Sequence, residues 1–441
     1  MRTQGVRWTS AAALAVAGVL FAACAAKPAP ATGAGGAAGS SSQGGATGSM
    51  GGAPGVGGDT MGLKLGTGGP FNFPQNRVSG TCTLTTAAGA AGAAQTAYMS
   101  WKNSFVTSNG AGAAGNLRVQ RPNSNGSNTN NDTVSEGIGY GMLAAAYMRD
   151  QATFDSLLKY GQSHFNANGL MSWHIDSSGG TLDMGSASDG DADMAWALIM
   201  ASDQWSSPTY LTAAANMIRA MRMHSTGPDG LLKPGDNWGG TALTNPSYFS
   251  PAYFRVFAIV TGDLLWSRDI LDKNYLVLSE VSGADGLVPD WSNDDGVVNM
   301  GFLVPATGAP GGSSSDDKDN SHYRYDAART PWRIAMDWCF NKEPRAQAYL
   351  MKIGGFFNPM ANNIGNVGDG YALNGSVSSN NHNMAFIGPI GVAGMAGFPA
   401  LADAAFAYGV TNQGDLSYFP SSLRMISMLM MSGNFLDYTK M

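Results

Sequence analysis

Apolar residues along most of the chain recur at steps of three and four positions, which is the spacing of one face of an α-helix. Ile138, Met142 and Ala145 follow this spacing in one segment, and Leu211 and Ile218 follow it in another. The segments with this pattern are predicted helices, at residues 94–107, 136–149, 152–164, 190–204, 208–224, 251–265, 267–281, 331–341, 343–355, 383–396, 399–409 and 420–432. Convincing strands are few, so we expect an all-α fold.

Several of these predicted helices are apolar on every side. The stretches MAWALIMA and SSLRMISMLMM are of this kind, which is typical of fully buried helices. The connecting loops alternate between short and long, and the long ones are rich in Gly, Asn, Ser and Asp. About twelve helices with strongly apolar inner members predict an (α/α)6 barrel of helical hairpins.

The N-terminal part of the chain differs in composition from the rest. Arg2 and Arg7 precede the apolar run AAALAVAGVLFAACAA, which ends in small residues as secretory signals do. From Lys27 to about Gly69 the chain has almost no large apolar residue, so burial cannot offset the entropy of ordering it. We therefore expect a signal peptide at residues 1–24, a flexible linker at 25–70 and a barrel domain at 71–441.

Cys24 follows LFAA and resembles the lipid-modified cysteine of bacterial lipoproteins. Two destinations therefore stay open. The protein is either secreted, or attached to the cell surface as a lipoprotein through Cys24, for example at an outer membrane. Both destinations imply an oxidising compartment.

The composition of the chain limits the classes of partner that we expect the barrel domain to bind. The formal net charge is -6 and no cluster of Lys and Arg appears, so nucleic acid is not expected as a partner. We expect a monomer. Cys82 and Cys339 either pair with each other or remain two buried thiols, and Trp196 and Trp332 are expected to pack in the core.

The segment TVSEGIGYGML places Glu136 at the start of a predicted helix. A capping box formed by Thr133 and Glu136 would account for the acid. It would not account for Gly137, Gly139 and Gly141, each of which weakens a helix by about 0.5–1 kcal/mol relative to Ala. Glycines at these positions indicate that a ligand or another backbone comes close.

The segment ASDGDADMAWALIMASDQW begins with three acids at alternate positions, Asp189, Asp191 and Asp193. Helix capping by Ser188 or Asp189, with the other acids near the positive helix end, is one interpretation. Capping needs only one aspartate, so at least one of the three should have another partner. Met194 stands where a calcium loop needs glycine, and we expect no metal.

A third segment, HYRYDAARTPWRIAMDW, contains Asp326 and Arg329. Pro331 fits the first turn of a helix that follows Thr330, so both charged residues should lie just before that helix. An ion pair or a turn aspartate is the structural interpretation, and such a pair contributes little where it is exposed.

The three segments gain meaning when they are taken together. In a barrel whose inner helices are parallel, the N-terminal ends of these helices share one face. Three carboxylates would then line one cleft, where positive helix ends keep one ionised and apolar walls keep another protonated. Glycoside hydrolysis requires this combination of a protonated acid and an ionised base.

The three segments also resemble those of glycoside hydrolase family 8. The stretch from Ala187 to Trp205 is similar to the family signature, and the resemblance covers roughly residues 71–441. It implies an (α/α)6 barrel, inverting hydrolysis of β-1,4-linked polysaccharides, and no metal or other cofactor. It also implies that Glu136 is the general acid, that Asp326 is the base of the cellulase-like subfamily, and that Asp189 binds the sugar ring at the cleavage point.

The same resemblance suggests four substrate-binding residues. Tyr248 in NPSYFSPAYFR matches a tyrosine near the attacking water, and Arg329 matches an arginine beside the base. Trp238 in DNWGG and Trp173 in LMSWHID match sugar-stacking aromatics. A Gly/Ser/Asp-rich stretch at residues 306–320 is expected to form a loop near the rim of the cleft.

The leading hypothesis is an exported endo-β-1,4-glucanase acting on cellulose-type or mixed-linkage β-glucan. A β-1,4-xylanase or a chitosanase on the same scaffold is an alternative, although Asp326 in the cellulase-like position argues against chitosan. A non-catalytic carbohydrate-binding lipoprotein is a second alternative, and a purely structural envelope protein is a third. The last of these leaves the acidic helix starts unexplained.

Overall fold

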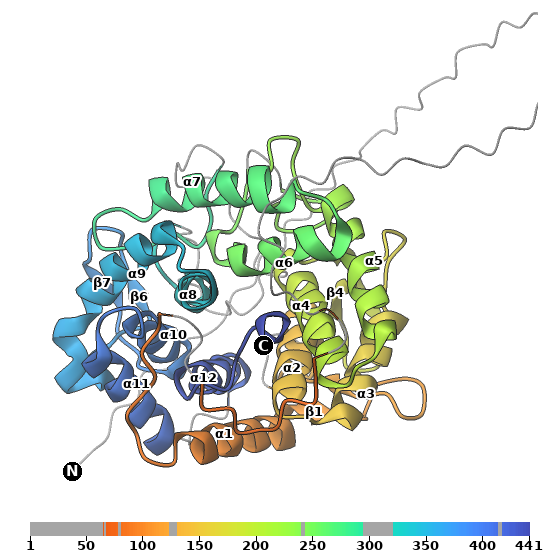
Figure 1. Cartoon of the computed structure of the whole chain (residues 1–441), viewed down its shortest axis with the longest axis horizontal. Helices are drawn as coiled ribbons and strands as arrows, with labels where there is room; N and C mark the ends of the chain where they lie inside the picture. The colour runs from red at the N-terminus through yellow and green to blue at the C-terminus, as the bar shows by residue number, and fades with distance from the viewer. Residues whose placement is uncertain are drawn as a thin grey trace, which may run out of the picture. The chain divides into compact units, whose positions relative to one another are not determined.

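Helices of the described chain alternate between an inner and an outer ring (Figure 1). The computed structural model describes Leu65 and residues 68–77, 81–122, 130–239, 243–293, 321–412 and 417–441. The outer ring contains α1 (Ala90–Phe105), α3 (Gln151–Ser163), α5 (Pro208–His224), α7 (Leu271–Val281), α9 (Pro344–Phe357) and α11 (Pro399–Thr411). The inner ring contains α2 (Ser135–Tyr147), α4 (Ser188–Gln204), α6 (Pro251–Thr261), α8 (Thr330–Asn341), α10 (Met384–Gly394) and α12 (Tyr418–Met431).

The two rings differ in burial as the sequence pattern predicts. Every residue of α2, α4 and α10 is buried, whereas an outer helix such as α5 buries one stripe that includes Ile218 and Met221. Burying one such apolar side chain stabilises the fold by about 1.5–3 kcal/mol, so the apolar inner helices are placed where they gain most. The predicted (α/α)6 barrel is confirmed, and Trp196 and Trp332 lie in its core, fully buried.

The first turns of α2 and α4 touch through glycine. A Cβ on Gly190 would lie 2.7 Å from the carbonyl carbon of Ser135, and one on Gly139 would lie 2.8 Å from the Cβ of Asp193. Any larger residue would force the helices apart. The expectation that another backbone comes close to the glycines of α2 is therefore correct for Gly139, and the contact brings the starts of α2 and α4 together.

The opposite end of the barrel is closed by the segment around Phe71 and by the C-terminal residues. Gln204, the last residue of α4, accepts the Phe71 N–H at 2.7 Å and donates to its carbonyl at 2.9 Å. The Phe71 ring stacks on Tyr438 at 4.2 Å, and the Tyr147 hydroxyl donates to the Leu436 carbonyl at 2.8 Å. Since Gln204 and Tyr147 end their helices, these contacts close the face formed by helix ends, and the helix starts lie at the opposite face.

Short strands lie between some of the helices. They are β1 (Val106–Thr107), β2 (Arg118–Val119), β3 (Thr133–Val134), β4 (Ser172–Ile175), β5 (Thr181–Ser186), β6 (Gly370–Tyr371) and β7 (Val377–Ser379). The order β3-β4-β5 is antiparallel, with Val134 opposite His174 and Ser172 opposite Ser186. Because β3 leads into α2 and β5 leads toward α4, this sheet joins the two helix starts.

Two of the differences between predicted and observed helix boundaries have a clear local cause. The helix predicted at 251–265 stops at Thr261, because Gly262 adopts the left-handed conformation that terminates helices. The helix predicted at 267–281 begins with a π-helical turn, η2 (Trp266–Ile270). Four 3₁₀ turns complete the described elements, η1 (Pro246–Tyr248), η3 (Ala327–Arg329), η4 (Asn358–Asn366) and η5 (Tyr438–Lys440).

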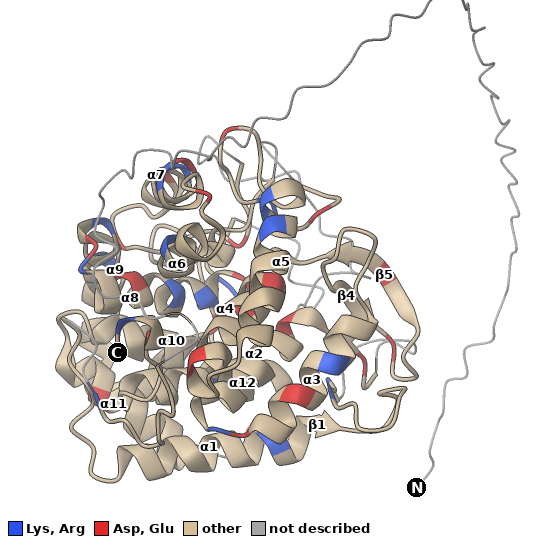
Figure 2. Cartoon of the chain, turned by 45° about the vertical axis from the view of Figure 1, so that its right-hand side comes forward, with Lys and Arg blue, Asp and Glu red and all other residues tan. Residues whose placement is uncertain are grey.

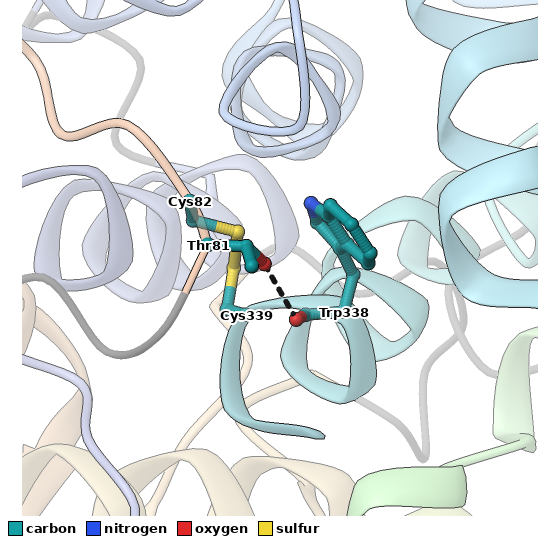
Figure 3. The surroundings of a disulfide bond; sticks show 4 residues. All are labelled: Thr81, Cys82, Trp338 and Cys339. Atoms are coloured by element: carbon teal, nitrogen blue, oxygen red, sulfur yellow. Dashed lines mark hydrogen bonds between the residues drawn. A yellow bond between two sulfur atoms is a disulfide. The ribbon is translucent and has the colours of Figure 1, made fainter. Parts of the chain in front are cut away.

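Cys82 and Cys339 form a disulfide (Figure 3). The bond joins the segment before α1 to the C-terminal part of α8, and the Thr81 hydroxyl donates beside it to the Trp338 carbonyl at 3.0 Å. Of the two alternatives for these cysteines, pairing is therefore the correct one.

The described residues lie in a unit that runs from Asp59 to Met441. Leu65 is half-buried and packs against the core, although it falls within the expected linker. The expected signal peptide, Cys24, the rest of the linker apart from residues 68–70, and the loop at 306–320 lie outside the described residues. Among the helices that the structure describes, none combines the length and the hydropathy that a membrane span requires.

Candidate active site

Three carboxyl groups from distant parts of the chain converge on the guanidinium of Arg329. Its Nη1 lies 2.5 Å from Glu136 Oε2 and 2.8 Å from Asp189 Oδ2, and its Nη2 lies 2.6 Å from Asp326 Oδ1. The Arg329 side chain is 1% exposed. Figure 2 shows the surroundings, with acidic and basic positions inside the barrel near α4 and α8 on a largely uncharged ribbon. The structure thus brings together the four charged residues that the sequence singles out.

Glu136 is the second residue of α2, and its carboxylate does not cap that helix. Val134 precedes the helix without a side-chain cap, and Thr133 lies in β3. The capping-box interpretation of Thr133 and Glu136 is therefore wrong. Glu136 instead accepts a hydrogen bond from the Tyr418 hydroxyl at 2.9 Å through Oε1, while Oε2 binds Arg329.

Asp189 is likewise engaged outside helix capping. Ala187 precedes α4 without a side-chain cap, and Ser188 donates its hydroxyl proton to the Lys233 carbonyl at 2.6 Å. The interpretation of Ser188 or Asp189 as the cap is therefore wrong. Asp189 accepts the Gly190 N–H at 2.8 Å through Oδ1 and binds Arg329 through Oδ2.

The other two acids of the same segment have separate partners. Asp191 lies in the first turn of α4, as expected, and accepts the Met171 N–H at 3.3 Å. Asp193 lies beyond the first turn and forms a two-pronged ion pair with Arg333, at 2.8 Å and 2.7 Å. The prediction that Asp193 stabilises the helix start is therefore wrong, because its carboxylate binds Arg333 on another helix. The three acids serve three different partners.

Asp326 lies immediately before η3, the 3₁₀ turn that leads into α8. This turn lets Arg329 reach back to a residue three positions earlier. Asp326 Oδ2 accepts the indole N–H of Trp291 at 3.1 Å. Its side chain is 13% exposed, compared with 6% for Glu136 and 2% for Asp189, so it is the carboxylate that solvent reaches most easily. The predicted ion pair between Asp326 and Arg329 is therefore present. It is buried, so it is not the weak exposed pair that the sequence analysis considered.

Burial and charge separate the acids electrostatically. Burial raises the pKa of Glu136 to about 7, with a further upward contribution from Asp189. Arg329, the Tyr418 hydrogen bond and Arg121 act in the opposite direction and keep the pKa from rising further. Glu136 therefore carries a proton over much of the range below neutral pH, as a general acid must. Asp189, Glu136 and Asp326 raise the pKa of Arg329 well above its usual value against the effect of burial, so the guanidinium stays charged.

Aromatic side chains line the same region. The Tyr248 ring lies 5.0 Å from the Arg329 guanidinium, and its buried hydroxyl has no hydrogen-bond partner among the described residues. Half-buried Trp238 donates to the Ser186 carbonyl at 3.1 Å and lies 5.5 Å from the ring of Trp291. Tyr248 thus lies beside the guanidinium that binds the acids, and Trp238 is connected to Asp326 through Trp291.

Trp173 lies on β4, in the sheet that joins the starts of α2 and α4. Its described ring contact is a stack on His174 at 4.7 Å, and its side chain is almost entirely buried. It therefore lies at the same face of the barrel without a recorded contact to the three acids.

Two residues whose described hydrogen bonds reach the acids of the site are missing from the sequence prediction. Tyr418 begins α12, so the argument that inner helix starts share one face applies to it as well as to the acids. Trp291 lies in an irregular segment, and the pattern of the sequence around it carries no comparable signal. Among the described residues no group of three or more His, Cys, Asp or Glu is arranged to hold a metal ion.

Comparison with known proteins agrees with this geometry. The model of the family described as glycosyl hydrolases family 8 matches residues 71–433. Endoglucanase A of Acetivibrio thermocellus is 40% identical over 353 residues, which cover 76% of this chain and 68% of that protein. The exo-oligoxylanase Rex8A of Paenibacillus barcinonensis is 26% identical over 70% of this chain and 83% of its own.

A solved structure extends the agreement to three dimensions. The apo β-1,3-1,4-glucanase from Paenibacillus sp. X4 superposes with a TM-score of 0.71 at 29% identity, covering 83% of this chain and 98% of that chain. The family match spans most of the barrel, from the segment that closes one end to the last inner helix. The chain belongs to glycosyl hydrolases family 8.

Proposed function

We propose that this protein is an endo-β-glucanase that cleaves β-1,4 linkages with inversion of configuration. The observation that carries the proposal is the single guanidinium that binds Glu136, Asp189 and Asp326 while one of these acids has a pKa near 7. Inverting glycosidases require an acid that is protonated and a second carboxylate that activates water. Both groups are present around Arg329.

The roles follow from the surroundings of each group. Glu136 donates its proton to the glycosidic oxygen, which leaves as a hydroxyl. Asp326, the most exposed of the three carboxyl groups, accepts a proton from water while that water attacks the anomeric carbon from the opposite face. Asp189 accepts hydrogen bonds from the sugar at the cleavage point. The Tyr248 hydroxyl, which has no hydrogen-bond partner among the described residues, is available to the attacking water.

Cellulose-type or mixed-linkage β-glucan is the proposed substrate class. An endoglucanase and a β-1,3-1,4-glucanase are among the relatives, at 40% and 29% identity, whereas the exo-oligoxylanase is 26% identical. Trp238, next to the Trp291 that donates to Asp326, provides a flat apolar face, which suits the face of a pyranose ring. A xylanase or a chitosanase remains the alternative that direct assay must test.

The assay that tests the function measures reducing-sugar release from carboxymethylcellulose, mixed-linkage glucan, xylan and chitosan in parallel. We expect release from the two glucans, with a fall in viscosity that reveals cleavage within the chain. NMR of the earliest products should show the α-anomer first, because water attacks opposite the leaving group. A first-formed β-anomer would mean retention and a different pair of acids, and no release from any glycan would favour a binding protein.

Glu136→Gln should lower kcat by about 10²–10⁴-fold, because the amide cannot supply the proton. In the unchanged enzyme, kcat/KM should fall as the pH rises through about 7, where the acid loses its proton. This alkaline limb should disappear from the residual activity of the variant. Glu280→Gln, at an exposed position of α7, is the matched control. A Glu136→Gln enzyme with more than half of the original turnover would remove Glu136 from this role.

Asp189→Asn should lower kcat by at least about tenfold with little change in Tm, because bonds that strengthen in the transition state are lost. The alkaline limb should also move to lower pH, because Asp189 raises the pKa of Glu136 and the amide does not. Asp191→Asn is the control, since burial raises the pKa of Asp191 well above its usual range and the neutral amide resembles its protonated form. Unfolding of Asp189→Asn with full activity in the folded fraction would instead assign Asp189 a structural role.

We also propose that the chain is exported, either as a secreted protein or as a lipoprotein anchored at Cys24. The apolar N-terminal run and the disulfide support this, since disulfides persist mainly in oxidising compartments. Intact-mass analysis of the protein from cells that express the full chain should show loss of the first 23 or more residues, with or without lipid on Cys24. A mature protein that retains residues 1–23 in a reducing compartment would contradict export.

A further inference from the structure

Two ion pairs connect α4 and the start of α8 like the rungs of a ladder. Asp189 and Asp193 are four residues apart on α4, and Arg329 and Arg333 are four residues apart at the start of α8. Asp189 binds Arg329 at 2.8 Å in the upper rung, and Asp193 binds Arg333 at 2.8 Å and 2.7 Å in the lower rung. Both side chains of the lower rung are fully buried. The mechanism uses only the upper rung.

The lower rung is tied to further helices. Arg333 donates to the Ser250 hydroxyl at 3.0 Å, and the Tyr253 hydroxyl donates to Asp193 at 3.2 Å. Ser250 and Tyr253 flank the first residues of α6. Gly139 of α2 approaches the Cβ of Asp193 so closely that a side chain there would clash. Four inner helices therefore meet at this pair, one helical turn below the three acids.

We propose that Asp193 and Arg333 are positioning residues that hold Arg329 against the three carboxyl groups of the site. This inference rests on the proposed function. The two-pronged pair sets the register between α4 and α8, and Arg329 is the last residue of η3, immediately before α8. Because Asp193 neutralises Arg333, the second guanidinium cannot compete with Arg329 for Asp189. A buried pair of this kind adds little to stability by itself, which leaves geometric control as its contribution.

The consequence for Glu136 follows from the groups that face it. These are Arg329, Asp189, Tyr418, Arg121 and, at longer range, Tyr140 and Tyr248. Arg329 is the largest influence that lowers the pKa of Glu136 against burial. Loss of the lower rung loosens Arg329, so Glu136 should hold its proton to higher pH. The reacting groups themselves remain unchanged.

The test is the double variant Asp193→Asn/Arg333→Met, which removes both buried charges together and leaves none unpaired. Arg255 and Asp337 provide a control pair of the same two-pronged type. Asp337 lies one turn further along α8 and binds Arg255 through both oxygens, and Arg255, whose side chain is 29% exposed, also pairs with Glu343. The control double variant is Asp337→Asn/Arg255→Met. Two measurements are made on each protein, namely kcat and KM on soluble β-glucan, and the titration of Glu136 by NMR of ¹³C-labelled glutamate. The chain contains only three glutamates, Glu136, Glu280 and Glu343, so the signal can be assigned.

The lower-rung double variant should lose about 10-fold to 100-fold in kcat with KM little changed, because a small misplacement of catalytic groups is enough for such a loss. Glu136 should titrate at higher pH than in the unchanged protein. The control should alter Tm without moving either quantity. Arg333→Lys, which keeps the charge but not the two-pronged geometry, should recover part of kcat.

The single substitution Asp193→Asn also breaks the two-pronged pair and leaves Arg333 free to compete with Arg329 for Asp189. Glu136 should therefore again titrate at higher pH than in the unchanged protein, because Arg329 is the largest influence that lowers its pKa. Unchanged kcat and unchanged Glu136 titration in the lower-rung double variant would overturn the proposal, as would equal effects in the control. An unmodified protein that releases sugar from no glycan would instead contradict the proposed function, and the titration would still decide the positioning role.

Discussion

The buried guanidinium of Arg329 is the interaction on which the active-site face depends. It joins carboxyl groups from the starts of α2 and α4 and from the turn before α8, three segments far apart in sequence. Moving ions from water into a protein interior costs several kcal/mol each, and only close partners offset this cost. Three carboxyl groups around one cation leave a surplus of negative charge if all are ionised. Burial, with a smaller contribution from Asp189, raises the pKa of Glu136 to about 7. Below neutral pH its protonation relieves this surplus, and the protonated form is also the state that a general acid requires.

Contacts elsewhere in the barrel hold the buried charges around Arg329 in place. Glycine contacts between α2 and α4 bring Glu136 and Asp189 within reach of the same nitrogen. The far end is closed by Phe71, Tyr438 and the hydrogen bonds of Gln204, and the disulfide holds α8 near its C-terminal end. The contacts that close the far end and the disulfide thus lie away from the helix starts. The helix starts can then carry buried charge that costs stability.

Sequence periodicity predicts the helices well because the inner ones are apolar on all sides and the outer ones have one apolar stripe. Glycine, proline and the acids also indicate correctly which segments meet at one face. Capping was the wrong interpretation for Glu136 and Asp189. Capping rules use only neighbouring residues, whereas the partner of both acids, Arg329, lies 193 and 140 residues away in the sequence. The contacts of Tyr418 and Trp291 with the acids are long-range in the same way. Tyr418 begins an inner helix and could have been found by the rule that helix starts share one face, whereas no pattern around Trp291 indicates its place.

The spacing of charges on α4 and α8 explains why a short segment contains three acids. Each occupies a different environment, with Asp189 at the reacting face, Asp191 against the segment that leads into β4, and Asp193 inside the barrel against Arg333. A helix repeats its direction about every four residues, so a second acid four positions on faces the same partner helix. Arg329, at the end of η3, and Arg333, on α8, are separated by the same four positions. The Asp189–Arg329 pair, which takes part in the reaction, therefore lies one helical turn from the Asp193–Arg333 pair, which contains no reacting group. Through this helical geometry the lower pair fixes the position of the upper one.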